Sequence, residues 1–199
     1  RGGNAVDAGV TASMALSVLQ PDMVSFACVA PTLIYMKEQD KVVSLAGLGY
    51  WPKSTDVAKL IAAGNGKAVP ENLLRTVIPA APATYITALR RYGTISFEEA
   101  VTPAMELAKN GFAVYPLLST NIEYLENSFR RWPDNERIFL PKGRAPRVGE
   151  LFVQEDLAKT MARLIQAERD CKGDRDKKLA AVHDYFYRGP IAREISDYH

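Results

Sequence analysis

The sequence predicts an α+β chain that is mostly helical, with one short pair of strands near its N-terminus. Apolar residues recur at spacings of three and four in most segments, as they do on one face of a helix. Ser, Asn and Gly stand at the ends of these segments, where they favour helix starts and stops. Only two runs, residues 32–36 and 41–45, have the short β-rich pattern of a hairpin.

The first helix is expected at residues 4–19, with Gly3 or Asn4 as its cap and Pro21 after its end. Its small residues lie close to one stripe, and its larger apolar residues broaden the apolar surface. A helix that is apolar around most of its circumference is buried. We therefore expect a layer, most simply a sheet, to pack closely against the stripe, which consists of Ala5, Ala8, Gly9, Ala12 and Ala15.

The strands at 32–36 and 41–45 follow, and further helices come after them. In the helix at 96–111, Ser96 and Glu99 have the spacing of a capping box, and Pro103 is expected to kink the helix or restart a new one. Residues 170–178 are rich in charge and are expected to form a solvated loop. The other expected helices are 54–64, 83–92, 116–129, 154–168 and 189–198.

Composition excludes several classes of protein. The net charge of +2 gives no charge excess that would attract nucleic acid or an anionic membrane. The apolar stretches are too short to span a membrane. Two cysteines, Cys28 and Cys171, permit at most one disulfide and exclude a disulfide-dense scaffold. The chain begins at a helix start and ends within an amphipathic pattern, so we expect it to be a piece of a longer polypeptide.

No complete catalytic constellation is visible in the residues. "GLGYWP" at 47–52 has two glycines at dinucleotide-like spacing but lacks the third, which favours a tight turn with an aromatic lid over a nucleotide fingerprint. Cys28 has no base partner in sequence and is better explained as a small core residue than as a nucleophile. His183 is interpreted as a packed or surface residue beside aromatics rather than as a catalytic base. No metal-ligand spacing is present, and no cofactor is indicated.

Five segments in order resemble gamma-glutamyltransferases over nearly the whole chain. "GGNAVDAGVTASMALSVLQP" is similar to the family's "GGNAVDAAVA…ALGVVEP". "LIYM…KVVSLAG" looks like its strand pair, and the block from "VIPAAPATYI" to "GFAVYPLL" is similar to its "VPGTVAG…RYG…PAI.LAE.GF.V…L". "GELFVQEDLAKTMARLI" and "DYFYRGPIAREI" match two further motifs.

The resemblance implies an N-terminal nucleophile hydrolase with an αββα core. Such proteins are made as precursors that cleave themselves, and the new N-terminal Thr of the small subunit attacks an amide carbonyl. Residues 1–199 would be part of one domain, the N-terminal portion of the large subunit, completed by the C-terminal remainder of the precursor. The fragment alone would then be inactive and hold no catalytic residue. Asn4 and Asp7 would cap the first helix. Family members are often periplasmic or extracellular.

The sequence departs from the family where substrate is held. The family's "DGRE.AP" turn carries an arginine that grips the substrate α-carboxylate, whereas residues 46–52 place Leu48 there. Gly47, Leu48 and Tyr50 are the candidate substrate-binding residues, and they offer an apolar, aromatic surface to a small amide or peptide. The glycines of "VPGTVAG" are replaced by Ala80 and Thr84. Two readings remain: a divergent amidohydrolase or acyltransferase, or an inactive member that serves as a structural or interaction module.

Overall fold

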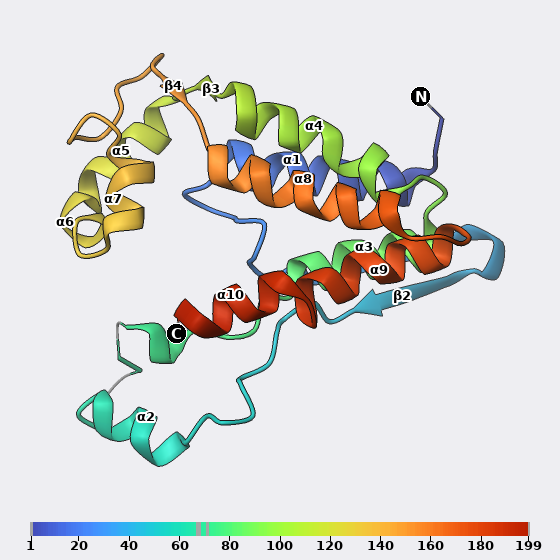
Figure 1. Ribbon diagram of the computed structural model, residues 1–199, viewed down its shortest axis with the longest axis horizontal. Coiled ribbons are helices and arrows are strands. Elements are labelled where there is room, and N and C mark those ends of the chain that lie inside the picture. The colour runs from blue at the N-terminus through green and yellow to red at the C-terminus, as the bar shows by residue number, and fades with distance from the viewer. Residues whose placement is uncertain (1, 67–68, 71, 199) are drawn as a thin grey trace.

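Long helices form the body of the computed structural model, which describes residues 2–66, 69–70 and 72–198. Within this part of the chain, α1 packs on α4, α4 on α8, α8 on α9, and α9 on α3 (Figure 1). One core of apolar side chains runs through the body, with Met14, Leu89, Phe97 and Leu164 almost fully buried. The body helices are α1 (Ala5–Leu19), α3 (Ala81–Tyr92), α4 (Phe97–Asn110), α8 (Glu155–Asp170) and α9 (Arg175–Tyr187).

The predicted hairpin is confirmed residue for residue. β1 (Thr32–Met36) and β2 (Lys41–Leu45) are antiparallel, with Thr32 opposite Leu45 and Met36 opposite Lys41. Asp40, at φ +44°, closes the connection between them after a short 3₁₀ turn. In the described residues this sheet has only these two strands. The observed elements are mostly helical with a strand pair, as the sequence predicts.

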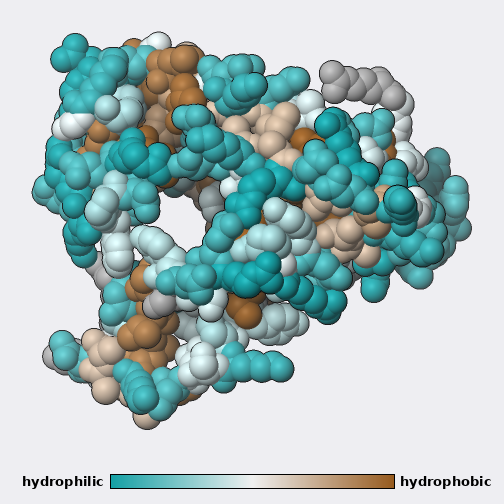
Figure 2. Space-filling model, viewed as in Figure 1, coloured by the Kyte–Doolittle hydropathy of each residue, from teal (hydrophilic) through white to brown (hydrophobic). Residues whose placement is uncertain are grey.

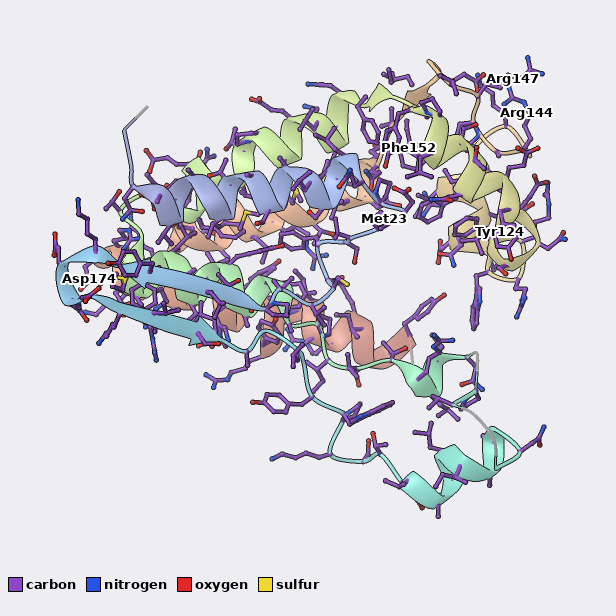
Figure 3. The ribbon with its side chains drawn as sticks, turned by 180° about the vertical axis from the view of Figure 1, so that it is seen from behind. Met23, Tyr124, Arg144, Arg147, Phe152 and Asp174 are labelled. Atoms are coloured by element: carbon purple, nitrogen blue, oxygen red, sulfur yellow. The ribbon has the colours of Figure 1, made fainter. Side chains whose placement is uncertain are left out.

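A small lobe projects from one end of the body and has its own core. It contains α5 (Pro116–Tyr124), α6 (Glu126–Phe129) and α7 (Pro133–Phe139), and the two-residue strands β3 (Phe112–Ala113) and β4 (Leu151–Phe152) join it to the body. Figure 3 places Phe152 at this junction. The buried residues of the lobe core are Val114, Leu118, Ile122, Leu140 and Phe152.

Asp22, just beyond the end of α1, attaches the lobe to the body. The Tyr115 hydroxyl donates to Asp22 Oδ1 at 2.5 Å, and the Asn121 amide donates to Asp22 Oδ2 at 2.8 Å. Burial, together with this carboxylate, raises the pKa of Tyr115. The side-chain amide of Gln154 donates to the Val18 carbonyl at 2.8 Å, which adds a third polar contact at the same place. The position of the lobe is therefore set by side chains from both parts of the chain.

Two expectations about the helices differ from the structure, and one helix, α7, was not expected. The expected helix at 116–129 is broken at Leu125, which lets Phe129 stack on Phe139 with ring centroids 4.4 Å apart. The expected loop at 170–178 is too long, because a helix begins at Arg175. Of the two effects expected at Pro103, a restarted helix does not occur, since Pro103 lies inside the single helix α4.

Helix α9 begins at Arg175, inside the segment expected to be a charged loop. The Asp174 side chain caps the helix by accepting a hydrogen bond from the Lys177 amide at 2.9 Å. Apolar residues Leu179, Val182 and Phe186 then enter the core from this helix. The first turn is charged because it faces solvent, so its composition hid a helix start. The remaining two helices are α2 (Val57–Ala63) and α10 (Pro190–Tyr198), both within expected ranges.

The small-residue stripe of α1 does not face a packed neighbour among the described residues. Ala8, Gly9 and Ala12 are exposed, and Ala15 is half-buried. The larger residues of the opposite side, including Val10 and Met14, fill the contacts with α4 and α3 instead. The expectation of a closely packed sheet on the stripe is therefore not met within this chain.

Asp7 is a buried carboxylate that ties the start of α1 to the loop between α3 and α4. It accepts hydrogen bonds from the Asn4 amide at 2.8 Å, the Thr94 amide at 2.8 Å and the Thr94 hydroxyl at 2.6 Å. The Ile95 amide adds a longer contact at 3.4 Å. Burial opposes ionisation of Asp7, but these donors outweigh it and lower its pKa. The expected capping role of Asn4 and Asp7 is confirmed, since both bonds of the capping box are present.

We predict that Asp7→Asn lowers the free energy of unfolding by about 2–3 kcal/mol at neutral pH, because an amide NH₂ would face the backbone donors. The folded-state pKa is below the unfolded value of about 3.9, so this stabilisation is present above that value and is lost as pH falls through the folded pKa. Urea unfolding of the complete protein between neutral and acidic pH measures it. Asp40→Asn, which changes an exposed carboxylate with one bond to Tyr35, is the matched control. An unchanged pH profile for Asp7→Asn would contradict the assignment.

Candidate functional site

The candidate substrate-binding turn, residues 46–52, leaves the end of β2 and is fixed at two points by backbone hydrogen bonds. The Ala30 amide donates to the Gly47 carbonyl at 2.8 Å. The Ile78 amide donates to the Tyr50 carbonyl at 2.8 Å. Segments that precede β1 and follow the turn are thereby held beside it. The tight turn predicted from the sequence is not formed: no hydrogen bond joins residues three apart within 46–52, and the first such bond comes later, from the Thr55 amide to the Pro52 carbonyl at 2.9 Å.

Glycine is required at two positions of this segment for conformation and for space. Gly47 has φ +56° and Gly49 has φ +73°, in the left-handed region that favours glycine. A Cβ at Gly47 would stand 2.3 Å from the Ala30 carbonyl oxygen, and one at Gly49 would stand 2.4 Å from the Ile78 oxygen. The glycine spacing is therefore explained by close backbone packing. It does not open a nucleotide-binding helix, because the chain enters no helix until Val57.

The side chains of the turn point away from the body. Leu48 is 61% exposed, Tyr50 is 81% exposed and Trp51 is 44% exposed. Tyr50 is almost fully exposed, so it does not form the expected aromatic lid over the described residues. Gly47, Leu48 and Tyr50 do lie together in one short turn. Their role in binding substrate stays a prediction.

The start of α3 packs directly against the turn. Thr84 in its first turn donates its hydroxyl to the Ala80 carbonyl at 3.1 Å, and that hydroxyl would lie 2.8 Å from a Cβ at Gly47. The Cys28 carbonyl accepts hydrogen bonds from the amides of Ala80 at 3.1 Å and Ala81 at 2.8 Å. Ala80 and Thr84, the two replacements of family glycines, are both buried here. They fit without leaving a buried side-chain polar atom unpaired among the described residues.

Tyr187 is the hydrogen-bond partner of the next amide at the start of α3. Its hydroxyl accepts from the Ala83 amide at 3.0 Å and donates to the Pro79 carbonyl at 2.7 Å. Burial raises the pKa of Tyr187 to about 12, so the phenol stays protonated at neutral pH. The amides at the start of α3 are thus occupied by protein groups. They are not free to stabilise an anion, and α3 holds the turn in place rather than acting on a substrate.

The other sequence candidates do not form a catalytic pair. Cys28 is half-buried. His183 Nδ1 lies 3.1 Å from Asp184 Oδ1, and its ring lies 4.8 Å from the ring of Tyr187. This agrees with the interpretation of His183 as a residue beside aromatics. Among the described residues, no group of three or more His, Cys, Asp and Glu side chains could hold a metal ion, and no helix is long and apolar enough to cross a membrane.

A polar hollow of about 380 Å³ lies at the start of α4, and most of its charged groups bond to other protein groups. Glu168, 4% exposed, accepts the amides of Phe97 at 2.9 Å and Glu98 at 2.7 Å. The Glu98 carboxylate pairs with Arg169. The Arg175 guanidinium donates to backbone carbonyls, including that of Ile95 at 2.9 Å. These groups join helices, so the hollow is structural.

The cap supplied by Glu168 was missed in the sequence. Glu168 follows Leu164 by four residues and Ile165 by three, which places it on the apolar face of its helix. An acidic residue on a face that is otherwise buried requires partners, because burying an unpaired charge is costly. That spacing was the available signal. The partner could not be read from it, because Phe97 lies far away in the sequence.

The chain is similar in sequence to one protein family and to several of its members. The sequence profile of the family described as Gamma-glutamyltranspeptidase matches residues 1–198. The chain is 29% identical over 202 residues to a glutathione hydrolase proenzyme of Bacillus subtilis (strain 168), covering 99% of this chain and 32% of the relative. It is 30% identical over 206 residues to the acylase ACY 1 proenzyme of Pseudomonas sp. (strain SE83), covering 99% and 34%.

A solved structure extends the likeness to three dimensions. The crystal structure of a cephalosporin acylase from Bacillus halodurans aligns with a TM-score of 0.82 at 28% identity, covering 98% of this chain and 34% of that chain. The expected α+β, N-terminal nucleophile hydrolase fold class is confirmed by such neighbours. The chain spans about a third of the length of the curated relatives it matches.

We predict that Gly47→Ala destabilises the complete protein more than Gly66→Ala does. Both positions have positive φ, +56° and +70°, so both substitutions carry a backbone cost of about 1–2 kcal/mol. Only at Gly47 does the new methyl group meet the Ala30 carbonyl, whereas no described residue lies within 4 Å of a Cβ at Gly66. Thermal unfolding of the two variants measures the difference. Equal losses would show that close packing does not hold this turn.

Proposed function

Because this chain belongs to the gamma-glutamyltranspeptidase family, we propose that it is the N-terminal part of a precursor that becomes an amide hydrolase or acyl transferase. The similarity to both a glutathione hydrolase proenzyme and an acylase proenzyme supports this reaction class. In this proposal, residues 1–199 are part of one domain in the large subunit. The C-terminal remainder of the precursor completes that domain and supplies the small subunit.

The reaction we propose needs a nucleophile from outside these residues. After cleavage of the precursor, the hydroxyl of an N-terminal Thr attacks the substrate's amide carbonyl, and its own α-amine accepts the hydroxyl proton. The C–N bond breaks, the amine leaves with that proton, and an acyl ester remains on the Thr. Water or an acceptor amine then attacks the ester and releases the acid or a new amide. No cofactor takes part.

The proposed substrate preference rests on residues 46–52. Leu48 stands where the family has an arginine for the substrate α-carboxylate, and a leucine cannot make the bidentate contact of a guanidinium. A desolvated carboxylate without its partner loses about 2–5 kcal/mol of binding, roughly thirty- to several-thousand-fold in affinity. With exposed Tyr50 beside it, the turn offers an apolar surface. We therefore propose that the enzyme prefers acyl groups without an α-carboxylate at this position.

The second candidate is an inactive family member with a structural or interaction role. Loss of the arginine and of the two glycines motivates it. Ala80 and Thr84 are accommodated with the Thr84 hydroxyl bonded inside α3, so loss of these glycines leaves the fold intact and fits either candidate. A Thr or Ser at the cleavage junction of the precursor, followed by self-cleavage, would separate the two candidates.

We predict that residues 1–199 alone hydrolyse no amide, because no nucleophile–base pair is assembled among the described residues. Turnover of acyl anilides by the purified chain should stay at the buffer rate, whereas the processed precursor should be active. Turnover by the chain alone that disappears on mutation of one of its own residues would refute this.

We predict that the processed protein hydrolyses simple acyl anilides better than γ-glutamyl anilide. Leu48→Arg should raise kcat/KM for γ-glutamyl anilide by about tenfold or more, because it restores a cation for the α-carboxylate, while activity on acyl anilides should fall.

Leu48→Gln, which adds polarity without charge, is the matched control and should not raise γ-glutamyl activity. Lys53→Ala tests whether the neighbouring lysine already serves the carboxylate. Efficient γ-glutamyl turnover by the unaltered enzyme, unchanged in Leu48 and Lys53 variants, would overturn the assignment.

A further inference from the structure

One part of the chain leaves the body and has no core of its own. We call it the arm: the described residues 51–66, 69–70 and 72–77. None of these residues is buried, in contrast to every helix of the body. Figure 1 shows α2 near the end of this projection, well away from the body helices, and apolar side chains gather on the projecting segment in Figure 2.

The root of the arm is nevertheless fixed. The Gly47 and Tyr50 carbonyls accept the Ala30 and Ile78 amides, each at 2.8 Å, so the outgoing and returning chains are joined beside the body. Backbone contacts at Gly49 leave no room for even a methyl group. The arm therefore projects from a defined neck, and its direction is set by the body.

Helix α2 carries an apolar stripe that the described residues leave largely exposed. Val57, Leu60 and Ile61 have the spacing of one helix face, and Val57 is 65% and Ile61 54% exposed. Ala62 lies on the opposite side. Leu60, the third member, is half-buried. A helix of seven residues is far below the roughly twelve needed for stability in water. The Asp56 side chain caps it, accepting from the Ala58 amide at 2.9 Å, but a cap alone does not offset the cost of ordering it.

We propose that the arm is an interaction surface whose α2 stripe docks on an apolar surface of the remainder of its own precursor. Two observations and one general principle support that occupant. The relatives this chain matches are about three times as long, so most of such a precursor lies outside these residues. Before the precursor is cleaved, its remainder is covalently linked to the arm and is therefore present at high effective concentration, so docking can form before processing. Trp51 and Leu74, also exposed, extend the apolar surface along the arm as an interface of several side chains requires.

The inference rests on the proposed two-part protein, but not on its activity or substrate. It is tested by hydrogen–deuterium exchange on the processed, full-length protein. The Leu60 amide donates to the Asp56 carbonyl at 3.0 Å and the Gly64 amide to the Leu60 carbonyl at 3.2 Å. In a docked α2 these amides should exchange at least about a hundredfold more slowly than in an unstructured peptide. Exchange within about threefold of the peptide rate would overturn the proposal.

Two variants with the same added charge separate docking from helix stability. Val57→Asp puts a carboxylate on the stripe, at the first helical position, where the helix dipole favours it. Ala62→Asp puts one on the opposite side, near the C-terminal end, where the dipole disfavours it. Docking predicts that Val57→Asp raises the exchange rate about tenfold or more while Ala62→Asp changes it little. The reverse order would show that α2 is merely a local helix and would overturn the proposal.

Dilution and activity identify the occupant and keep the two proposals distinguishable. Protection within one precursor does not change on about a hundredfold dilution, whereas protection by a second copy is lost, which would overturn the assignment of the occupant. An inactive protein with a protected α2 would refute the proposed function alone. An active protein with an unprotected α2 would refute only the role of the arm.

Discussion

The buried carboxylate of Asp7 is the contact on which the arrangement of the body helices depends. It lies at the start of α1 but takes most of its hydrogen bonds from Thr94 and Ile95, which precede α4. Gly93 has to be glycine for this contact, because a Cβ there would stand 2.5 Å from Asp7 Oδ1. The side-chain amide of Asn4 also donates to the Tyr92 carbonyl at 2.7 Å, where α3 ends. One short segment, residues 4–7, therefore fixes where α3 ends and where α4 starts.

Glu168 repeats the same solution at the next helix pair. Its carboxylate from the end of α8 accepts the first amides of α4, which would otherwise lack partners at a buried helix start. The N-terminus of a helix also carries partial positive charge that favours the carboxylate. Asp22 joins the lobe to the body in the same way, by accepting hydrogen bonds from Tyr115 and Asn121. In each case an acidic side chain gives a directional contact between elements whose apolar packing alone is less specific.

The sequence predicts the local part of this fold well and the distant part poorly. The strands at 32–36 and 41–45, the capping box of Ser96 with Glu99 and the cap formed by Asn4 and Asp7 depend on neighbouring residues, and all are confirmed. The start of α9 was missed because its exposed first turn has the composition of a loop. The break at Leu125 was missed because it depends on the packing of the lobe.

In the candidate site too, features set by distant residues could not be predicted. The two glycines after a strand predict a tight turn at 46–52, but no hydrogen-bonded turn forms there. The reason that both must be glycine, contact with the Ala30 and Ile78 carbonyls, depends on segments that no local pattern brings together. The stripe on α1 was assigned to a packed interface because the helix is apolar all round. The structure buries the side with larger residues and leaves Ala8 and Ala12 exposed.

Two elements, α1 and the hairpin, leave apolar side chains exposed. α1 is apolar on both sides, and the hairpin exposes Leu33, Tyr35 and Val42 on one face. A two-stranded sheet is marginally stable by itself, and apolar faces of this kind mark interaction sites in soluble proteins. The chain thus folds its helices around carboxylate contacts that are complete within it, while its strands and its candidate substrate turn present unpartnered surface. Rigid helices that position an exposed segment are consistent with the proposed site, whose nucleophile would come from another part of the precursor.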